Sequence, residues 1–272
     1  MRYQWKVLPF GIRQAPSEAH HRLQSLLQEL VDEGVVIVYI DDILVVTETR
    51  EEHAAVLEWV YALLEREGYY VKPSKLQLCQ RSVVFLGHTL GYKTIGPKQQ
   101  KVIDIKGMPP PPSVHQVRQW TAAVNWVAKF MRDVHRTMAP IQQLTRKSTK
   151  FKWTEECQEA YRRINAQLND LPNLTSPDIT KPFRLYTDAS LIGCGAILMQ
   201  DHGVLGFYSK AWRRETSDKW SARERELRGI LEALRHFRLT LYGRNVLVYS
   251  DHESLSQSSP ILRASTGRWL HG

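Results

Sequence analysis

The chain has 272 residues, 43% of them hydrophobic, which is enough for one large domain or two ordinary domains with packed cores. Lysine and arginine total 37 against 28 acidic residues, and the net charge of +9 favours a polyanionic partner such as nucleic acid. Cys79, Cys157 and Cys194 have neither metal-ligand spacing nor an even disulfide framework, which fits a reducing intracellular setting. No stretch approaches the roughly 20 apolar residues of a membrane span, and residues 1–6 lack a signal-peptide core. We therefore expect no membrane partner.

The first predicted element is a helix over residues 16–33. Pro16 suits the first turn of a helix, and Gly34 is the residue type that most often follows the last turn. Between them, apolar side chains recur at helical spacing: Ala19, Leu23, Leu26, Leu27, Leu30 and Val31. We expect this helix to pack beneath the strands that follow.

Residues 35–46 form two short β-branched apolar runs that flank the adjacent carboxylates Asp41 and Asp42. Runs of this length are typical of strands, so the two acids are expected at the tip of a hairpin. Burying two unpaired carboxylates would cost several kcal/mol, so the fold must supply a cation, a basic partner or open water. On these residues alone, a bound divalent metal ion and a solvated Asp-Asp turn are both open.

A second helix and two strands follow. Residues 49–52 form a capping box and Gly68 ends the helix, whose buried stripe is expected to contain Val56, Val60, Leu63 and Leu64. Strands are predicted at residues 69–71 and 82–86.

The middle of the chain begins with residues 108–112, a methionine followed by four prolines. This run favours an extended polyproline conformation and marks a stiff boundary. Ser113 caps a helix that buries Val117, Trp120, Val124, Val127 and Met131 and carries the basic residues Arg118, Lys129, Arg132 and Arg136 elsewhere. Thr154 caps a further helix with Cys157, Ala160, Ile164 and Leu168 facing inward.

The last part is predicted to contain three antiparallel strands, a helix and a fourth strand. The strands cover residues 183–190, 193–200, 203–212 and 245–252, and the helix, capped by Ser221 with Glu224, buries Leu227, Ile230, Leu234, Phe237 and Leu241. A crossover helix places the first and fourth strands side by side, so Asp188 and Asp251 emerge at neighbouring strand ends within reach of Glu226. Three acids without a basic partner in their local sequence suit two Mg²⁺ ions that activate water and stabilise a leaving oxygen.

Tyr39-Ile40-Asp41-Asp42 resembles the Tyr-x-Asp-Asp box of reverse transcriptases. Residues 5–16 look like the palm segment that touches the incoming nucleotide and the template. The sequence Phe-Leu-Gly-His at residues 85–88 is similar to the primer-grip hairpin of gypsy-type long-terminal-repeat retroelements. The order and spacing of these three boxes indicate part of a reverse transcriptase palm.

The resemblance implies roles for individual residues. Asp41 and Asp42 would be catalytic and would hold Mg²⁺. Phe10 and Gly11 would contact the deoxynucleoside triphosphate, Gln14 the template and Lys72 the phosphates, although a solvated lysine is equally open at position 72. The primer grip would consist of Phe85, Leu86, Gly87 and His88. In the family a further aspartate and the fingers precede the Pro-Phe-Gly segment, so we expect the isolated chain not to polymerise DNA.

The sequences Thr-Asp-Ala-Ser at residues 187–190 and Ser-Asp-His-Glu-Ser-Leu at residues 250–255 resemble the ribonuclease H of the same retroelements. The resemblance implies that Asp188, Glu226 and Asp251 are catalytic and bind Mg²⁺, or alternatively Mn²⁺. In the family a fourth acid lies further on than Gly272, so we expect cleavage of a hybrid to be slow or absent.

The expected fold is α+β or α/β. It consists of a partial palm at residues 1–107, a thumb-like helical connection at residues 108–180 and an RNase H-like mixed-sheet domain at residues 181–272. The resemblance implies RNA-directed DNA synthesis and degradation of RNA in an RNA:DNA hybrid, with template-primer nucleic acid as partner, in a cytoplasmic particle or the nucleus. A non-catalytic nucleic-acid-binding remnant and a host-adopted interaction protein stay open as alternatives.

Overall fold

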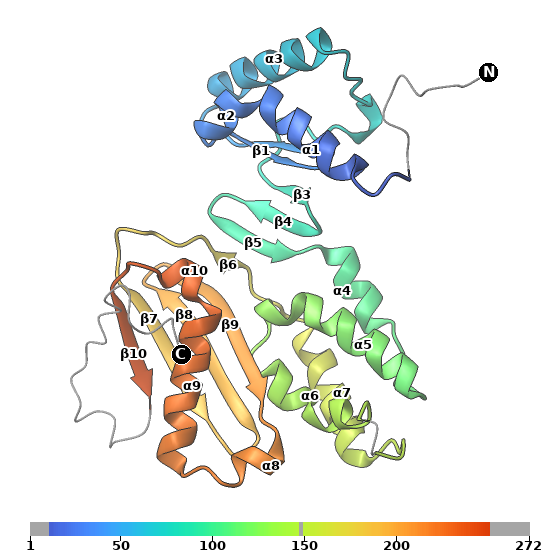
Figure 1. Cartoon of the computed structure of the whole chain (residues 1–272), viewed down its shortest axis with the longest axis vertical. Coiled ribbons are helices and arrows are strands. Elements are labelled where there is room, and N and C mark those ends of the chain that lie inside the picture. The colour runs from blue at the N-terminus through green and yellow to red at the C-terminus, as the bar shows by residue number, and fades with distance from the viewer. Residues whose placement is uncertain (1–10, 147–148, 251–272) are drawn as a thin grey trace. The chain divides into compact units, whose positions relative to one another are not determined.

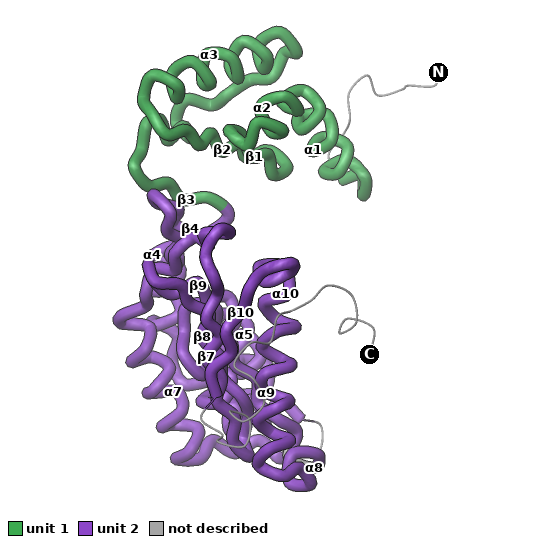
Figure 2. The backbone as a smooth tube through the Cα atoms, turned by 90° about the vertical axis from the view of Figure 1, so that its left-hand side faces the viewer, with its two compact units in different colours: residues 1–85 green, residues 86–272 purple. Residues whose placement is uncertain are grey.

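The computed structural model describes residues 11–146 and 149–250 and divides the chain into two compact units (Figure 2). Unit 1 comprises the described residues up to Phe85, and unit 2 those from Leu86 onward. The polyproline segment at residues 108–112 lies within unit 2. Across both described ranges, no helix combines the length and the apolar character that a membrane crossing requires.

Unit 1 is built on a two-stranded antiparallel hairpin with helices packed against it (Figure 1). Its elements are α1 (Ala15–Leu26), α2 (Gln28–Asp32), β1 (Val36–Tyr39), β2 (Asp42–Val45), α3 (Arg50–Arg66), the 3-10 turn η1 (Pro73–Lys75) and β3 (Val83–Phe85). The core contains Leu23, Leu27, Leu30, Val36, Val56, Val60 and Leu64. The predicted hairpin is confirmed, and Tyr39 pairs with Asp42 across its turn.

Three local predictions in unit 1 are wrong. The single helix expected at residues 16–33 is broken at Leu27, which keeps both Leu27 and Leu30 in the core. Residues 69–71 form no strand and lead instead into η1. The capping box of α3 is only half formed: the Thr49 hydroxyl accepts a hydrogen bond from the Glu52 N–H, but the Glu52 carboxylate accepts from the N–H of Glu48.

The first part of unit 2 is a helical layer with a small antiparallel sheet. Its elements are β4 (His88–Gly91), β5 (Thr94–Pro97), α4 (Gln99–Lys106), α5 (Val114–Val127), η2 (Ala128–Phe130), α6 (Val134–Gln143), α7 (Glu155–Gln167) and β6 (Leu174–Thr175). The predicted N-caps Ser113 and Thr154 both accept hydrogen bonds from the first turns of their helices. Trp120 is 1% exposed, so it belongs to the core between these helices.

The second part of unit 2 is a mixed four-stranded sheet in the order β10-β7-β8-β9. Its elements are β7 (Phe183–Ala189), β8 (Gly193–Gln200), β9 (Gly203–Ala211), α8 (Arg214–Ser217), α9 (Ala222–His236), α10 (Arg238–Leu241) and β10 (Val246–Ser250). Strand β10 runs parallel to β7, and the other pairs are antiparallel. This is the predicted arrangement, and Ser221 and Glu224 form the complete capping box expected for α9.

Helices cover both faces of this sheet. Alternate residues of β9 point to opposite faces, so Tyr208 reaches Glu232 on α9 whereas Ser209 bonds to His135 on α6. The predicted burial of Leu227 is wrong, because it is 46% exposed. The buried stripe of α9 runs through Glu226, Gly229, Ile230 and Ala233. Leu227 directly follows Glu226 and is therefore rotated about 100° away from this stripe.

Candidate functional site

Asp41 and Asp42 lie at the tip of the β1–β2 hairpin, as predicted. Asp41 is in the turn, Asp42 begins β2, and both are exposed. Ile40, the first residue of the turn, has a φ of 56°, and its N–H donates a hydrogen bond to Nδ1 of His20 on α1 at 3.2 Å. The histidine therefore ties the turn to the helix, a role that the adjacent pair His20-His21 did not indicate. Within the described residues neither carboxylate forms an ion pair.

Two adjacent, exposed carboxylates present the hard oxygen ligands that Mg²⁺ prefers. This chemistry fits part of a metal site, with Asp41 and Asp42 as the side chains that would hold it. In the described ranges, no three histidine, cysteine or acidic side chains gather closely enough to hold a metal ion.

The other predicted nucleotide and template residues are spread along the chain of unit 1. Gly11 has a φ of +96°, Gln14 is the N-cap residue of α1, and Lys72 immediately precedes η1; all three are exposed. Phe10 lies outside the described residues. Where the structure describes the chain, no hydrogen bond or ion pair joins Gly11, Gln14 or Lys72 to the carboxylates, so their roles stay predictions.

The predicted primer grip includes a tight turn between Phe85 and His88. Leu86 and Gly87 both have left-handed backbone conformations, with φ of 48° and 78°. The His88 ring stacks on Trp126 of α5 with ring centroids 4.8 Å apart, and its Nε2 lies 3.1 Å from the Lys129 ammonium. Burial and the Lys129 charge lower the pKa of His88. Trp126 of α5 and Lys129 of η2 thus support the turn, and Lys129 does so from 41 residues further on, a contact that no local sequence pattern indicated.

In the mixed four-stranded sheet, the carboxyl ends of β7 and β10 lie side by side, with Thr187 opposite Ser250. Glu226, which is 5% exposed, bridges the two strand ends: Oε1 accepts the N–H of Ala189 at 3.1 Å, and Oε2 accepts the Ser250 hydroxyl at 3.2 Å. Asp188 is the residue after Thr187, whereas Asp251 lies outside the described residues. Glu226 therefore reaches the strand ends at which the sequence predicted a shared site.

Asp188 has a basic partner, contrary to the expectation from its local sequence. Its Oδ2 accepts a hydrogen bond from Nη1 of Arg136 on α6, and the same nitrogen lies 3.4 Å from Oδ1 of Asp133. Burial opposes the Arg136 charge, but the hydrogen bond to Asp188 and the charges of both aspartates outweigh it and raise the pKa of the guanidinium. The expectation failed because Arg136 is 52 residues away in sequence.

As arranged, Asp188 and Glu226 do not fit a pair of metal ions. Arg136 already neutralises the Asp188 carboxylate, and both oxygens of Glu226 accept hydrogen bonds from the protein. Two divalent ions need a net negative environment, and the Arg136 charge makes the surroundings of Asp188 less negative. Catalytic roles for Asp188, Glu226 and Asp251 accordingly stay predictions.

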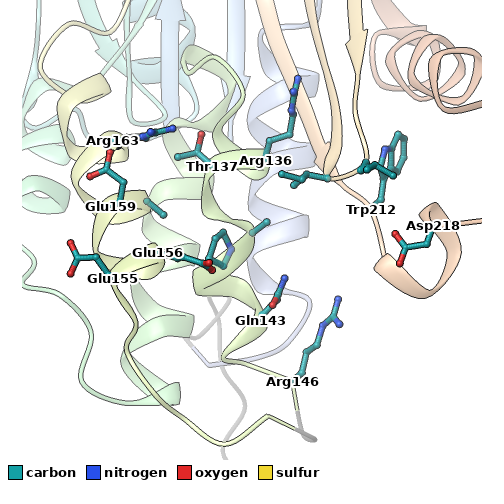
Figure 3. Close-up of a pocket in the computed structure, with 15 residues that line it drawn as sticks. Arg136, Thr137, Gln143, Arg146, Glu155, Glu156, Glu159, Arg163, Trp212 and Asp218 are labelled. Carbon is teal, nitrogen blue, oxygen red and sulfur yellow. Dashed lines mark hydrogen bonds and ion pairs between the residues drawn. The ribbon is translucent and has the colours of Figure 1, made fainter. Parts of the chain in front are cut away.

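A pocket of about 840 Å³ opens beside Arg136, between α6, α7 and the end of the sheet (Figure 3). Arginines and acids both line it: Arg136, Arg146 and Arg163, with Glu155, Glu156, Glu159 and Asp218. Charges of both signs give it no preference for a polyanion, so nucleic-acid binding cannot be located there.

Comparison with known proteins finds two family models, each of which matches a separate segment of the chain. A family model described as "Reverse transcriptase (RNA-dependent DNA polymerase)" matches residues 1–90. A second one, described as "RNase H-like domain found in reverse transcriptase", matches residues 153–248. The chain is also 30% identical over 258 residues to the retrovirus-related Pol polyprotein from transposon 412 of Drosophila melanogaster. That alignment covers 93% of this chain and 21% of the relative, so the chain spans about a fifth of that protein's length.

Two solved structures of a foamy viral protease-reverse transcriptase have a similar fold. One, described as dRH and in complex with double-stranded DNA, has a TM-score of 0.81 at 24% identity and covers 94% of this chain and 46% of that chain. The other, in complex with an RNA/DNA hybrid, has a TM-score of 0.76 at 25% identity and covers 97% and 37%. The predicted mixed helix and sheet architecture is confirmed by these matches.

Proposed function

Because this chain belongs to the Pol polyproteins of gypsy-type retrotransposons, where it comprises reverse transcriptase and RNase H-like segments, we propose that it acts on RNA:DNA hybrids as part of a longer protein. Unit 1 would supply Asp41 and Asp42 to the centre of RNA-directed DNA synthesis. Unit 2 would hold the template-primer through its helical connection and its RNase H-like domain. The parent activities would be DNA polymerisation and cleavage of the RNA strand.

The observation that carries this proposal is the exposed Asp41-Asp42 pair at the tip of a hairpin that lies within the reverse transcriptase match. The hairpin turn is anchored to α1 by His20, so the carboxylates are presented on fixed backbone rather than on a loose loop. Bound Mg²⁺ would supply activation of the primer hydroxyl and stabilisation of the leaving pyrophosphate. The protein's own contribution would be to orient the two carboxylates and the deoxynucleoside triphosphate.

Both families use divalent metal ions, and a foamy viral relative was solved with an RNA/DNA hybrid. The net charge of +9 suits the same class of partner. We propose Mg²⁺, with Mn²⁺ as a substitute, as the metal for Asp41 and Asp42, and a cytoplasmic particle or the nucleus as the location. Since the chain spans 21% of its relative, we propose that synthesis needs the longer polyprotein and expect no primer extension from the purified chain.

Binding of a fluorescent RNA:DNA hybrid, followed by anisotropy over a range of salt concentrations, tests the proposal. We expect binding that weakens steeply with salt, because lysines and arginines release counterions from the phosphates. The variant Asp41→Asn/Asp42→Asn should bind the hybrid at least as well, since it removes negative charge, but should lose any tightening of binding that Mg²⁺ produces. Absence of hybrid binding at low salt would refute the proposal.

A non-catalytic nucleic-acid-binding remnant and a host-adopted interaction protein are the alternatives. Incubation with the hybrid in Mg²⁺ and in Mn²⁺ separates the nuclease from both alternatives. Slow RNA cleavage that Asp188→Asn abolishes supports the nuclease, and salt-sensitive binding without cleavage supports the remnant. Primer extension by the purified 272-residue chain would show that it is complete for synthesis, contrary to expectation.

A further inference from the structure

The ion pair between Arg136 and Asp188 joins a largely buried guanidinium to an aspartate side chain that is 58% exposed. The Arg136 side chain is 23% exposed, although arginine is usually among the most exposed residue types. It forms ion pairs with Asp188 on β7 and Asp133 at the start of α6. One guanidinium thus lies between two carboxylates from different elements.

Two glycines of β8 make the room that this arrangement needs. A Cβ atom on Gly195 would lie 2.1 Å from Oδ1 of Asp133, and one on Gly193 would lie 2.9 Å from Cγ of Arg136. Gly193 also faces the backbone of β9, where a Cβ would meet the Lys210 carbonyl oxygen at 2.2 Å. A larger residue at position 195 would displace the Asp133 carboxylate from its place beside Arg136.

Helix α6 is fixed to the sheet on the other side of Arg136 as well. The backbone N–H of His135 donates to the Ser209 hydroxyl at 2.9 Å, and its ring contacts both Ser209 and Asn125 at 3.1 Å. The buried face of α6 carries Val134, Met138 and Ile141. The arginine therefore approaches Asp188 from a rigid support, and Figure 3 shows it on α6 beside the pocket that opens there.

We propose that Arg136 is an internal counter-ion that keeps Asp188 from binding a divalent metal ion, so that the helical connection holds the RNase H-like centre in a metal-free resting form. This inference rests on the proposed function, because it concerns the same centre. Cleavage of the hybrid would then require the Arg136 guanidinium to leave the Asp188 carboxylate.

The physical basis is competition for one carboxylate. A metal ion at Asp188 would lie within a few ångströms of the guanidinium, where charges of the same sign repel each other. Metal binding would also break an ion pair, and an exposed pair of this kind contributes up to about 1 kcal/mol, or roughly fivefold in a binding constant. Removing the arginine charge should therefore tighten metal binding by up to about fivefold.

The experiment measures Mn²⁺ binding to the full chain by electron paramagnetic resonance of free Mn²⁺, without nucleic acid. Every protein carries Asp41→Asn/Asp42→Asn, so that the polymerase carboxylates do not contribute. The test variant is Arg136→Gln. The matched control is Arg163→Gln, which removes an arginine of α7 that is paired with Glu159 at 2.8 Å. Thermal unfolding verifies that each variant is folded.

We expect Arg136→Gln to bind Mn²⁺ more tightly than the parent and the control, by up to about fivefold, and Asp188→Asn to abolish that gain. Unchanged or absent Mn²⁺ binding in a folded Arg136→Gln variant overturns the inference. If that variant does not fold, Mn²⁺ binding by the parent is compared with and without Asp188→Asn. Unchanged binding means that Asp188 holds no metal ion while Arg136 is present and supports the inference, and clearly weaker binding overturns it. Hybrid binding is measured separately, so the proposed function can stand when this inference fails.

Discussion

The substitution Gly87→Ala tests how the predicted primer-grip turn is held. Gly87 has a φ of +78°, and a Cβ there would lie 2.7 Å from Cζ2 of Trp126. The left-handed backbone costs an alanine about 1–2 kcal/mol. Overpacking against the indole adds about 1–3 kcal/mol, because Trp126 is stacked on His88 and cannot move without disturbing it. The free energy of unfolding of unit 2 should fall by about 2–5 kcal/mol.

The matched control is Gly243→Ala. Gly243 also belongs to unit 2 and has a φ of +69°, but nothing lies within 4 Å of its Cβ position, so only the backbone cost of about 1–2 kcal/mol applies. Urea unfolding followed by tryptophan fluorescence compares the two variants. The double variant Gly87→Ala/Trp126→Leu should recover the steric part of the loss relative to Trp126→Leu alone. If Gly87→Ala is no more destabilising than Gly243→Ala, the contact with Trp126 does not hold the turn.

Three further outcomes follow from the contacts in unit 2. Glu226→Leu should lower the free energy of unfolding by about 1–3 kcal/mol in a urea titration, because it leaves the Ala189 N–H and the Ser250 hydroxyl without their acceptor. A change below about 0.5 kcal/mol would contradict the bridge. Burial lowers the pKa of His88, His135 and His236 below 6.5, so as the pH falls these side chains bind protons more readily in the unfolded chain than in the folded one. The urea midpoint should therefore fall as the pH drops from about 7.5 to about 5.5, and an unchanged midpoint would be inconsistent with their burial. Burial raises the pKa of Cys194 to about 12, whereas Cys79 is exposed, so iodoacetamide at about pH 8 should label Cys79 and spare Cys194 in the native protein. Mass spectrometry reads the labelling, and equal labelling of Cys194 would disprove its burial.

Local sequence was sufficient for most secondary structure, because the decisive interactions join residues three or four positions apart. The N-caps Thr49, Ser113, Thr154 and Ser221 were all identified correctly. The four strands of the RNase H-like sheet also lie where their apolar runs predicted. Errors arose where neighbours in space decided the outcome. Residues 69–71, for example, have strand-like composition but pair with no strand in the described part of the chain.

In the candidate sites too, local sequence determined where the side chains lie, and contacts distant in sequence determined their partners. The sequence alone predicted Asp41 and Asp42 at a hairpin tip, because the apolar runs of the two strands and the short turn between them determine that position. It also predicted that Glu226 lies near two strand ends, because the crossover topology brings those ends together. Only the tertiary structure decided which partners these groups have. His20 bonds to the turn 20 residues later, Lys129 approaches His88 from 41 residues away, and Arg136 neutralises Asp188 across 52 residues. The electrostatic environment of a carboxylate depends on its distance in space from other charges. For Asp188, the packing of α6 against the sheet sets the distance to the Arg136 guanidinium.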